Sequence, residues 1–314
     1  MPDDYLETKG ELSGELNPKK KKKRKHWWQI AIDAVLVCLL LAVAGVSANV
    51  IYLTSNYGDA FFVDGVSMYP TLNKGALRKE TDGTYTKVTW RSGEQKAGDL
   101  VDYGWARMGE RGLSDLKRFD IVITYYEKDY QVDAAGTKTL KSDASLKIKR
   151  LIAFPGETVQ ISPDYDDSGN LSTPWGTLTI TSGSGKVSVY PSFYSFDDFE
   201  DIAIGSSIIT YRSKLTEANV TFGPYTLAAD SYFVLGDNRA SNFSSDSRNL
   251  ENQVTSNCLQ GKAYLITSLR ELKTNAKGNL EPVFKLSKVR PFWNYVHLDG
   301  QAIEKTKIED ASHA

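Results

Sequence analysis

A long apolar run near the start of the chain limits what the rest of it can fold into. Residues 28–53, WQIAIDAVLVCLLLAVAGVSANVIYL, contain one charged side chain, Asp33. About 20 apolar residues are enough to cross the hydrocarbon core of a bilayer as a helix, and Trp27 and Trp28 suit the interface between lipid and water. The run therefore predicts a transmembrane helix over residues 27–53, with everything after it folded on one side of the membrane.

A basic run directly precedes the apolar one. Residues 19–25 read KKKKKRK, and the positive-inside rule keeps such a segment in the cytoplasm. We therefore expect residues 1–26 to be a cytoplasmic basic tail of a single-pass cell-membrane protein whose later residues are extracytoplasmic. Two alternatives stay open. The basic run is also typical of a nuclear localisation signal, and VSA at 46–48 or AVA at 42–44 has the small residues that end a cleavable signal peptide.

Charge and cysteine content exclude several classes of protein. The first 28 residues hold eight Lys and Arg against five Asp and Glu, a net +3, so the chain's net charge of −1 leaves −4 for the remainder. A mildly acidic domain lacks the basic surface that nucleic acid requires. Cys38 lies in the apolar run and Cys258 far downstream, which gives neither a disulfide framework nor a CxxC zinc site. The sequence predicts no nucleic-acid partner and no metal.

From Ala60 onward the pattern predicts an almost entirely β protein. Short runs rich in β-branched and aromatic residues alternate with turn sequences such as DYDDSGNLS and TSGSGK. We expect a mainly β domain over residues 60–298 and a polar tail over 299–314. Residues 79–116, which are charged with little periodicity, and residues 160–218 are interpreted as insertions, the second as a small β subdomain. The expected strands are 61–65, 119–126, 145–154, 177–182, 186–191, 207–213, 219–227, 231–237, 262–272 and 282–290.

Three short motifs follow one another in this domain. They are SMYPTL at 67–72, KIKR at 147–150 followed by FPGE at 154–157, and GDNR at 236–239 followed by SSDSR at 244–248. Their order behind an apolar anchor resembles type I signal peptidases, the membrane-bound serine proteases that remove signal peptides, in a Gram-positive-like single-anchor form. The resemblance covers about residues 60–290 apart from the two insertions. It implies a signal-peptidase-type β catalytic domain with an inserted small β subdomain.

A nucleophilic serine needs a base, and histidine is poorly placed for that task here. Of the three histidines, His26 precedes the anchor and the other two lie in or near the tail. A lysine is the known alternative, provided that it is neutral near pH 7. The resemblance implies Ser67 as the nucleophile and Lys149 as the base. On alternation alone, however, LKIKR would be a strand with Lys147 and Lys149 facing water.

Other motif residues have supporting roles by resemblance. Asp246 and Arg248 are expected to form a structural ion pair that shapes the site. Ser244 is expected to orient the lysine, with Ser245 as the second choice because the preceding loop is longer than usual. The N–H of the nucleophile is the obvious oxyanion donor. Gly65 stands where some members carry a serine that adds a second donor, so that second donor stays open.

The resemblance also implies substrate contacts. Phe61, Val63 and Ile148 match positions that line the substrate pockets, and Met68 matches one that packs at the site, although all four would also suit an ordinary core. An extended peptide that adds to a sheet edge beside small apolar pockets predicts cleavage after the A-x-A pattern of signal peptides. The expected partners are preprotein signal peptides, the phospholipid membrane and the secretion translocon. No cofactor is implied.

We therefore expect a membrane-anchored serine endopeptidase that removes signal peptides by a Ser-Lys mechanism. One rival is a signal-peptidase-like assembly factor for surface proteins or pili, against which the presence of both Ser67 and Lys149 argues. Another is a self-cleaving Ser-Lys repressor, which shares the catalytic logic. The apolar anchor and the lack of a recognisable DNA-binding segment in the sequence disfavour that second rival.

Overall fold

The structure is a computed structural model that describes residues 26–87, 94–199, 202–204, 207–241, 243–283, 292–298 and 300–309. Contacts divide the chain into two units, residues 1–50 and residues 51–314. Helix α1 (Trp27–Asn56) contains the predicted apolar span, and its length and composition would allow it to cross a membrane. The predicted basic tail before residue 26 lies outside the described residues.

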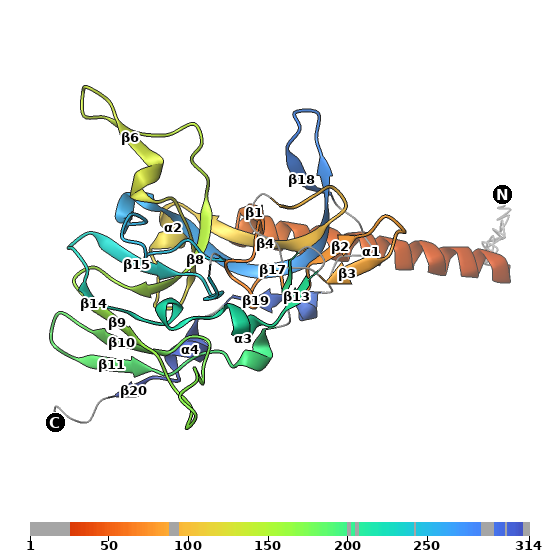
Figure 1. The fold of residues 1–314 in the computed structure, drawn as a ribbon. Coiled ribbons are helices and arrows are strands. Elements are labelled where there is room, and N and C mark those ends of the chain that lie inside the picture. The colour runs from red at the N-terminus through yellow and green to blue at the C-terminus, as the bar shows by residue number, and fades with distance from the viewer. Residues whose placement is uncertain are drawn as a thin grey trace, which may run out of the picture. The chain divides into compact units, whose positions relative to one another are not determined.

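The second unit is built on a large antiparallel sheet. Its described strands are β1 (Asp59–Phe62), β2 (Leu77–Lys79), β3 (Tyr85–Lys87), β4 (Leu100–Met108), β5 (Ile121–Thr124), β8 (Lys147–Ala153), β15 (Ser231–Leu235), β16 (Val254–Thr255), β17 (Leu259–Thr274), β18 (Leu280–Val283) and β19 (Val296–His297). The main path runs β16-β15-β8-β5-β17-β4-β2-β3, while β1 pairs with β4, and β18 and β19 pair with β17. Strand β17 lies at the centre and pairs with both β4 and β5 (Figure 1).

A second, smaller sheet packs against the first. It comprises β9 (Thr158–Ser162), β10 (Thr177–Thr181), β11 (Val187–Tyr190), β14 (Phe222–Thr226) and β20 (Ile308–Glu309), in the order β14-β9-β10-β11-β20, at the lower left of Figure 1. Side chains alternate along β10, where Leu178 and Ile180 are buried and the three threonines that flank them are partly exposed. Phe119, just before β5, and Ile152, in β8, belong to the same buried cluster as the two buried residues of β10. The two sheets therefore share a core.

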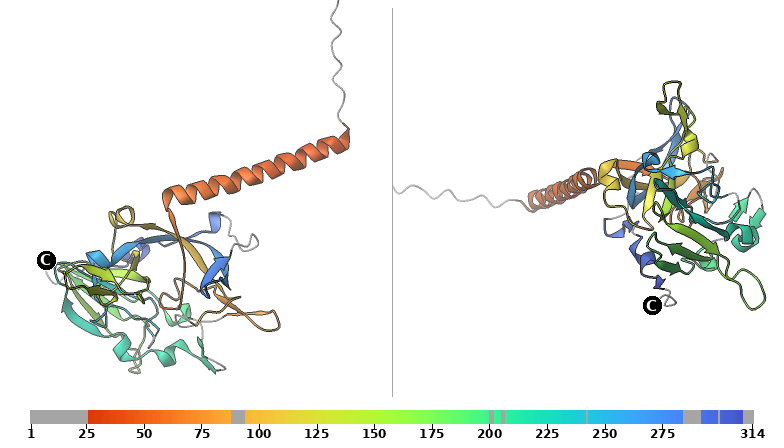
Figure 2. Two further views of the ribbon diagram at one scale, coloured as in Figure 1. Left: turned by 90° about the horizontal axis from the view of Figure 1, so that it is seen from above. Right: turned by 90° about the vertical axis from the view of Figure 1, so that its left-hand side faces the viewer.

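The remaining elements are short. Two hairpins are formed by β6 (Tyr130–Val132) with β7 (Lys138–Leu140), and by β12 (Ile202–Ile204) with β13 (Ser207–Ile209). The short helices are α2 (Glu110–Leu113), α3 (Tyr211–Lys214) and α4 (Gln301–Glu304), and single 3-10 turns are η1 (Glu127–Asp129), η2 (Phe196–Asp198), η3 (Glu217–Asn219), η4 (Ser256–Cys258) and η6 (Phe292–Asn294). The views in Figure 2 show the mainly β character from two further sides. The predicted fold class, mainly β behind one apolar helix, is confirmed.

Strand β4 lies within residues 79–116, which the sequence pattern predicts to be an insertion with little periodicity and in which it predicts no strand. Its nine residues pair with β1 on one side and β17 on the other, so they belong to the large sheet. The strand is hard to recognise because Asp102, a buried residue, interrupts its apolar pattern. Asp102 tolerates burial because its carboxylate accepts the Asn73 N–H at 2.6 Å and its own N–H donates to Asn73 Oδ1 at 2.9 Å.

Residues 300–309, part of the predicted polar tail, contain a short helix and a short strand. Strand β20 pairs with β11, and Ile303 packs against the core shared by the two sheets. Gly300 lies so close to Phe119 that a β-carbon there would come within 2.6 Å of the Phe119 backbone. This segment is polar in sequence, but it is held by backbone pairing and a few apolar contacts. The predicted strand 282–290 lies outside the described residues beyond Val283.

Candidate active site

Ser67 lies in the loop that joins β1 to β2. After it the chain turns sharply, with the Leu72 N–H donating to the Met68 carbonyl at 2.9 Å. Buried Asn73 closes the loop, since its side-chain amide donates to the Val63 carbonyl at 3.1 Å and to the Gly65 carbonyl at 3.0 Å. These bonds fix the path of the chain on both sides of the serine, whose side chain remains half-buried.

Lys149 reaches Ser67 from β8. Its ammonium donates to Ser67 Oγ at 2.9 Å and to the Ile148 carbonyl at 3.1 Å. The residue is only 4% exposed. Burial lowers the pKa of Lys149 to about 8, because the charged form loses its hydration. A neutral amine at this position could accept the Ser67 proton at a pH not far above neutrality.

The GDNR motif supports Ser67 from behind. Strand β15 pairs with β8, and Leu235 lies opposite Arg150. This pairing places the turn that follows β15 next to Ser67. There the Asn238 N–H donates to the Ser67 carbonyl at 3.0 Å. Gly236 is required by this close approach, since a β-carbon would lie 2.4 Å from the Ser67 carbonyl oxygen.

Arg150 and Asp237 form a buried ion pair beside Ser67 and Lys149. The Arg150 Nε donates to Asp237 Oδ1 at 2.7 Å and its Nη2 to Oδ2 at 2.5 Å, while Nη1 donates to the Phe119 carbonyl at 2.8 Å. The hydroxyls of Thr71 and Tyr194 also donate to Asp237 Oδ2. This cluster ties all three sequence motifs together, because each contributes one of its members.

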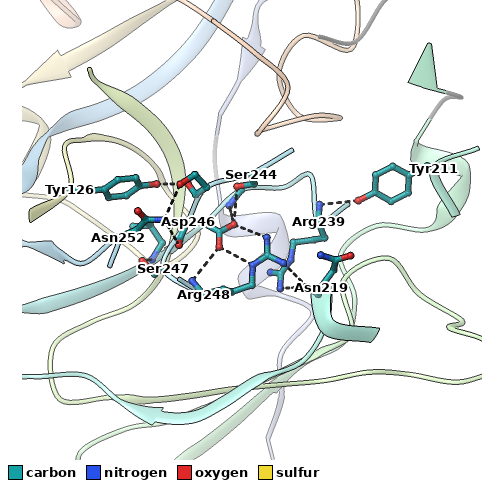
Figure 3. A network of polar contacts seen from close by, with 12 residues as sticks. Tyr126, Tyr211, Asn219, Arg239, Ser244, Asp246, Ser247, Arg248 and Asn252 are labelled. Atoms are coloured by element: carbon teal, nitrogen blue, oxygen red, sulfur yellow. Dashed lines mark hydrogen bonds and ion pairs between the residues drawn. The ribbon is translucent and has the colours of Figure 1, made fainter. Parts of the chain in front are cut away.

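A second buried carboxylate, Asp246, organises the neighbouring loop (Figure 3). Arg248 pairs with it at 2.8 Å and 3.0 Å, and the Gly236 N–H donates to it at 3.1 Å. Burial by itself would raise the pKa of Asp246, but the charge and hydrogen bonds of Arg248, with Arg239 and the Gly236 N–H, lower it to about 2. Both Arg239 and Arg248 also donate to the Asn219 carbonyl, at 2.9 Å and 2.7 Å. Asp246 is therefore ionised at any working pH.

Ser244 and Ser245, one of which is expected to orient the lysine, bond to other groups in this network, and that role stays a prediction. Ser244 Oγ donates to Asp246 Oδ2 at 2.8 Å, and Ser245 Oγ accepts from the Asn252 side chain at 2.9 Å. Within the described residues, neither serine makes a hydrogen bond to Lys149. An ionised carboxylate is a stronger acceptor than an amine that is neutral when active, which explains why Asp246 holds the Ser244 hydroxyl.

A cleft of about 720 Å³ is lined in part by Ser67 and Lys149. Phe61 and Ile148 line it together with Gly65, Ser67 and Lys149. Val63 and Met68, by contrast, are 2% and 1% exposed and belong to the core directly behind Phe61 and Ile148. Two of the four predicted substrate contacts thus face the cleft, and the other two form its backing.

The backbone N–H of Ser67 is the oxyanion donor that the sequence predicts. Among the described residues no acceptor takes the Ser67 N–H, which leaves it able to donate to a developing oxyanion. Gly65 provides no side-chain donor, and its carbonyl is taken by Asn73. Across the described residues no group of three or more His, Cys, Asp or Glu is arranged to hold a metal ion.

Comparison with known proteins places this geometry in a family. The model of the family described as "Signal peptidase, peptidase S26" matches residues 31–267, about three quarters of the chain. This chain belongs to the signal peptidase, peptidase S26 family. A similar protein is Signal peptidase I T of Bacillus subtilis (strain 168), which is 28% identical over 238 residues, covering 74% of this chain and 82% of that protein. The prediction of a signal peptidase made from the three motifs is confirmed at the level of the family.

Several residues that build this signal-peptidase site were not identified from the sequence. Asn73 and Asp102 fix the loop that carries Ser67. Tyr194 bonds to the Asp237 carboxylate, and the Trp175 ring nitrogen donates to the Asp237 carbonyl at 2.9 Å. Asn73 has a φ of +61°, a conformation that asparagine tolerates better than most residues. Its position directly after SMYPTL was the one local signal available. Tyr194 and Trp175 come from within the predicted insertion and carry no local signal.

Proposed function

We propose that this family member is a membrane-anchored serine endopeptidase that removes N-terminal signal peptides from exported preproteins. Ser67 is the nucleophile and Lys149 the general base. The observation that supports this most strongly is the 2.9 Å contact between Ser67 Oγ and the amine of buried Lys149 at the floor of the cleft. A serine and a lysine that meet away from water are the two components that acyl transfer without histidine requires.

The proposed reaction has two stages. Neutral Lys149 takes the Ser67 proton as Oγ bonds to the scissile carbonyl carbon, and the oxyanion that forms accepts the Ser67 N–H. The C–N bond then breaks, and the Lys149 ammonium gives its proton to the leaving amine. Neutral Lys149 next deprotonates a water that attacks the ester, which releases the signal peptide as a carboxylate and returns the proton to Ser67.

Selection of small residues follows from the shape proposed for the bound peptide. An extended substrate would lie in the cleft beside β1, and its alternate side chains would point toward the walls. Phe61 and Ile148 both line that cleft, and we propose that they bound the space for small apolar side chains. We therefore infer cleavage after A-x-A sequences, with the helix α1 anchor in the cell membrane and the catalytic domain outside it, where such sites emerge from the translocon.

The proposal is tested by mapping cleavage of a preprotein by the full-length protein in detergent or lipid vesicles. Mass spectrometry should place the cut after the second alanine of A-x-A. Replacing the alanine before the cut with leucine should abolish cleavage at that bond, because the proposed specificity is for small side chains. A cut at unrelated bonds, or one that tolerates leucine equally well, would contradict the specificity.

An assembly factor without peptidase activity is the alternative that the sequence left open. The Ser67–Lys149 contact and the burial of Lys149 argue against it, because a buried lysine with no carboxylate bonded to it is costly to maintain without a use. Failure of the full-length protein to cut any preprotein, while Ser67 can still be labelled by a serine-reactive probe, would favour that alternative.

A further inference from the structure

Lys147 lies two residues before the proposed base and on the same face of β8. Successive side chains of a strand point to opposite faces, so Lys147 and Lys149 project to one side about 7 Å apart along the strand. Both line the cleft. Lys149 is buried, whereas the Lys147 side chain keeps 23% exposure. A second, partly exposed lysine therefore lines the cleft near Lys149.

The Lys147 ammonium is held in place. It donates to Asp129 Oδ2 at 3.1 Å, to the Ser145 carbonyl at 2.6 Å and to Ser145 Oγ at 3.0 Å, which uses all three of its protons. It also lies 5.4 Å from the centre of the Tyr126 ring, a favourable position for a cation. Because Asp129 is fixed in turn by the Tyr126 N–H at 2.8 Å, the charge has little freedom to move away.

Resting on the dyad proposed above, we propose that Lys147 is a positioning residue that acts through Lys149. Its fixed positive charge in the cleft favours the neutral form of Lys149 and so sets the lowest pH at which the chain cleaves. A charge held near an amine disfavours protonation of that amine, and the partly dry cleft strengthens the effect relative to bulk water.

The other charged groups near Lys149 act differently. Asp237 and Asp246 favour its protonated form, and each is bonded to an arginine, Arg150 or Arg248, which offsets part of its charge. Lys147 is the neighbouring cation that lowers the pKa of Lys149. The ion pair of Lys147 with Asp129, on the η1 turn, offsets part of this effect.

The test is the pH dependence of kcat/KM for the full-length protein with an A-x-A preprotein. Lys147→Met should raise the midpoint of the profile by about half a pH unit or more, which lowers kcat/KM at neutral pH by about threefold. Lys147→Arg keeps the charge and should keep the wild-type midpoint. Lys277→Met removes a lysine from the exposed β17–β18 turn, outside the cleft, and controls for a general change of charge.

A fourth variant separates charge from structure. Asp129→Asn breaks the same ion pair but leaves the Lys147 charge, so its midpoint should stay at or below that of the wild type. If Asp129→Asn raises the midpoint as Lys147→Met does, or if Lys147→Met changes activity without moving the midpoint, the inference is wrong. Those results would leave the proposed function intact, whereas cleavage that survives loss of Ser67 would remove the function and the inference together.

Discussion

Lys149 and Arg150 are adjacent on one strand and have opposite fates. Their side chains point to opposite faces of β8. Arg150 meets Asp237 in a bidentate pair, while Lys149 meets a serine hydroxyl and a carbonyl. The nearby carboxylates of Asp237 and Asp246 are already bonded to arginines, so neither neutralises the lysine directly. A buried amine that lacks a bonded acid is the one that gives up its proton most readily.

The pH dependence of cleavage tests the role of this single residue, Lys149. We expect kcat/KM to rise with pH through an apparent pKa of about 8, since only the neutral form of Lys149 can accept the Ser67 proton. Below that pKa the rate should fall about tenfold per pH unit. Lys149→Arg should be inactive across the range, because guanidinium keeps its proton at any working pH. A flat profile, or an active Lys149→Arg, would contradict the role of Lys149.

The sequence predicts the contacts of some site residues better than those of others. Ser67 and Lys149 stand in short motifs whose order predicts their roles, although 82 positions separate them, and the structure brings their side chains together. Ser244 could not be assigned in the same way. Whether its hydroxyl turns to Lys149 or to Asp246 depends on which acceptor is charged in the folded chain, and a motif does not contain that information.

The elements explain why three distant motifs meet. Antiparallel pairing of β15 with β8 places the GDNR turn beside the strand that carries Lys149, and the turn then contacts the loop of Ser67. The approach is closest at Gly236, which has no β-carbon to separate the backbone of the turn from Ser67. The site thus depends on the register of one strand pair and on one glycine.

Gly236→Ala tests that dependence. The added β-carbon would lie 2.4 Å from the Ser67 carbonyl oxygen and 2.1 Å from Ser244 Oγ. The Ser67 backbone must therefore shift. A displacement of the nucleophile of this order should lower kcat by about 100-fold, with KM changing much less. Gly183→Ala is the matched control, since its β-carbon would meet nothing closer than 4.0 Å. Equal activity of the two variants would show that the contact is unimportant.

Strand β4 shows where element prediction fails. The sequence places no strand at residues 100–108 because Asp102 and Arg107 break the apolar pattern that marks a buried strand. Asp102 is nevertheless buried, because Asn73 from the nucleophile loop satisfies it. A partner 29 residues away in sequence is invisible to a local pattern. Strands such as β10, whose apolar residues alternate, were predicted almost to the residue.

At the scale of the whole molecule, an apolar helix precedes a β domain that contains the site. Family membership, the basic run and the apolar length of α1 support the proposed orientation, with the N-terminus in the cytoplasm. We expect protease added outside intact spheroplasts to digest the domain after Asn56 and to leave the basic tail protected. Immunoblotting with tags at each end would measure this, with a cytoplasmic protein as the control for intact membranes. Protection of the catalytic domain would contradict the proposed orientation.

The central claim is that Ser67 attacks the peptide bond, and one measurement tests it most directly. Full-length wild type and Ser67→Ala are compared for cleavage of a preprotein with an A-x-A site, after equal membrane insertion and equal thermal unfolding have been verified. We predict complete processing by the wild type and no processing above the uncatalysed background by Ser67→Ala, because the dyad then lacks its nucleophile. Cleavage by Ser67→Ala at the wild-type rate would contradict the account.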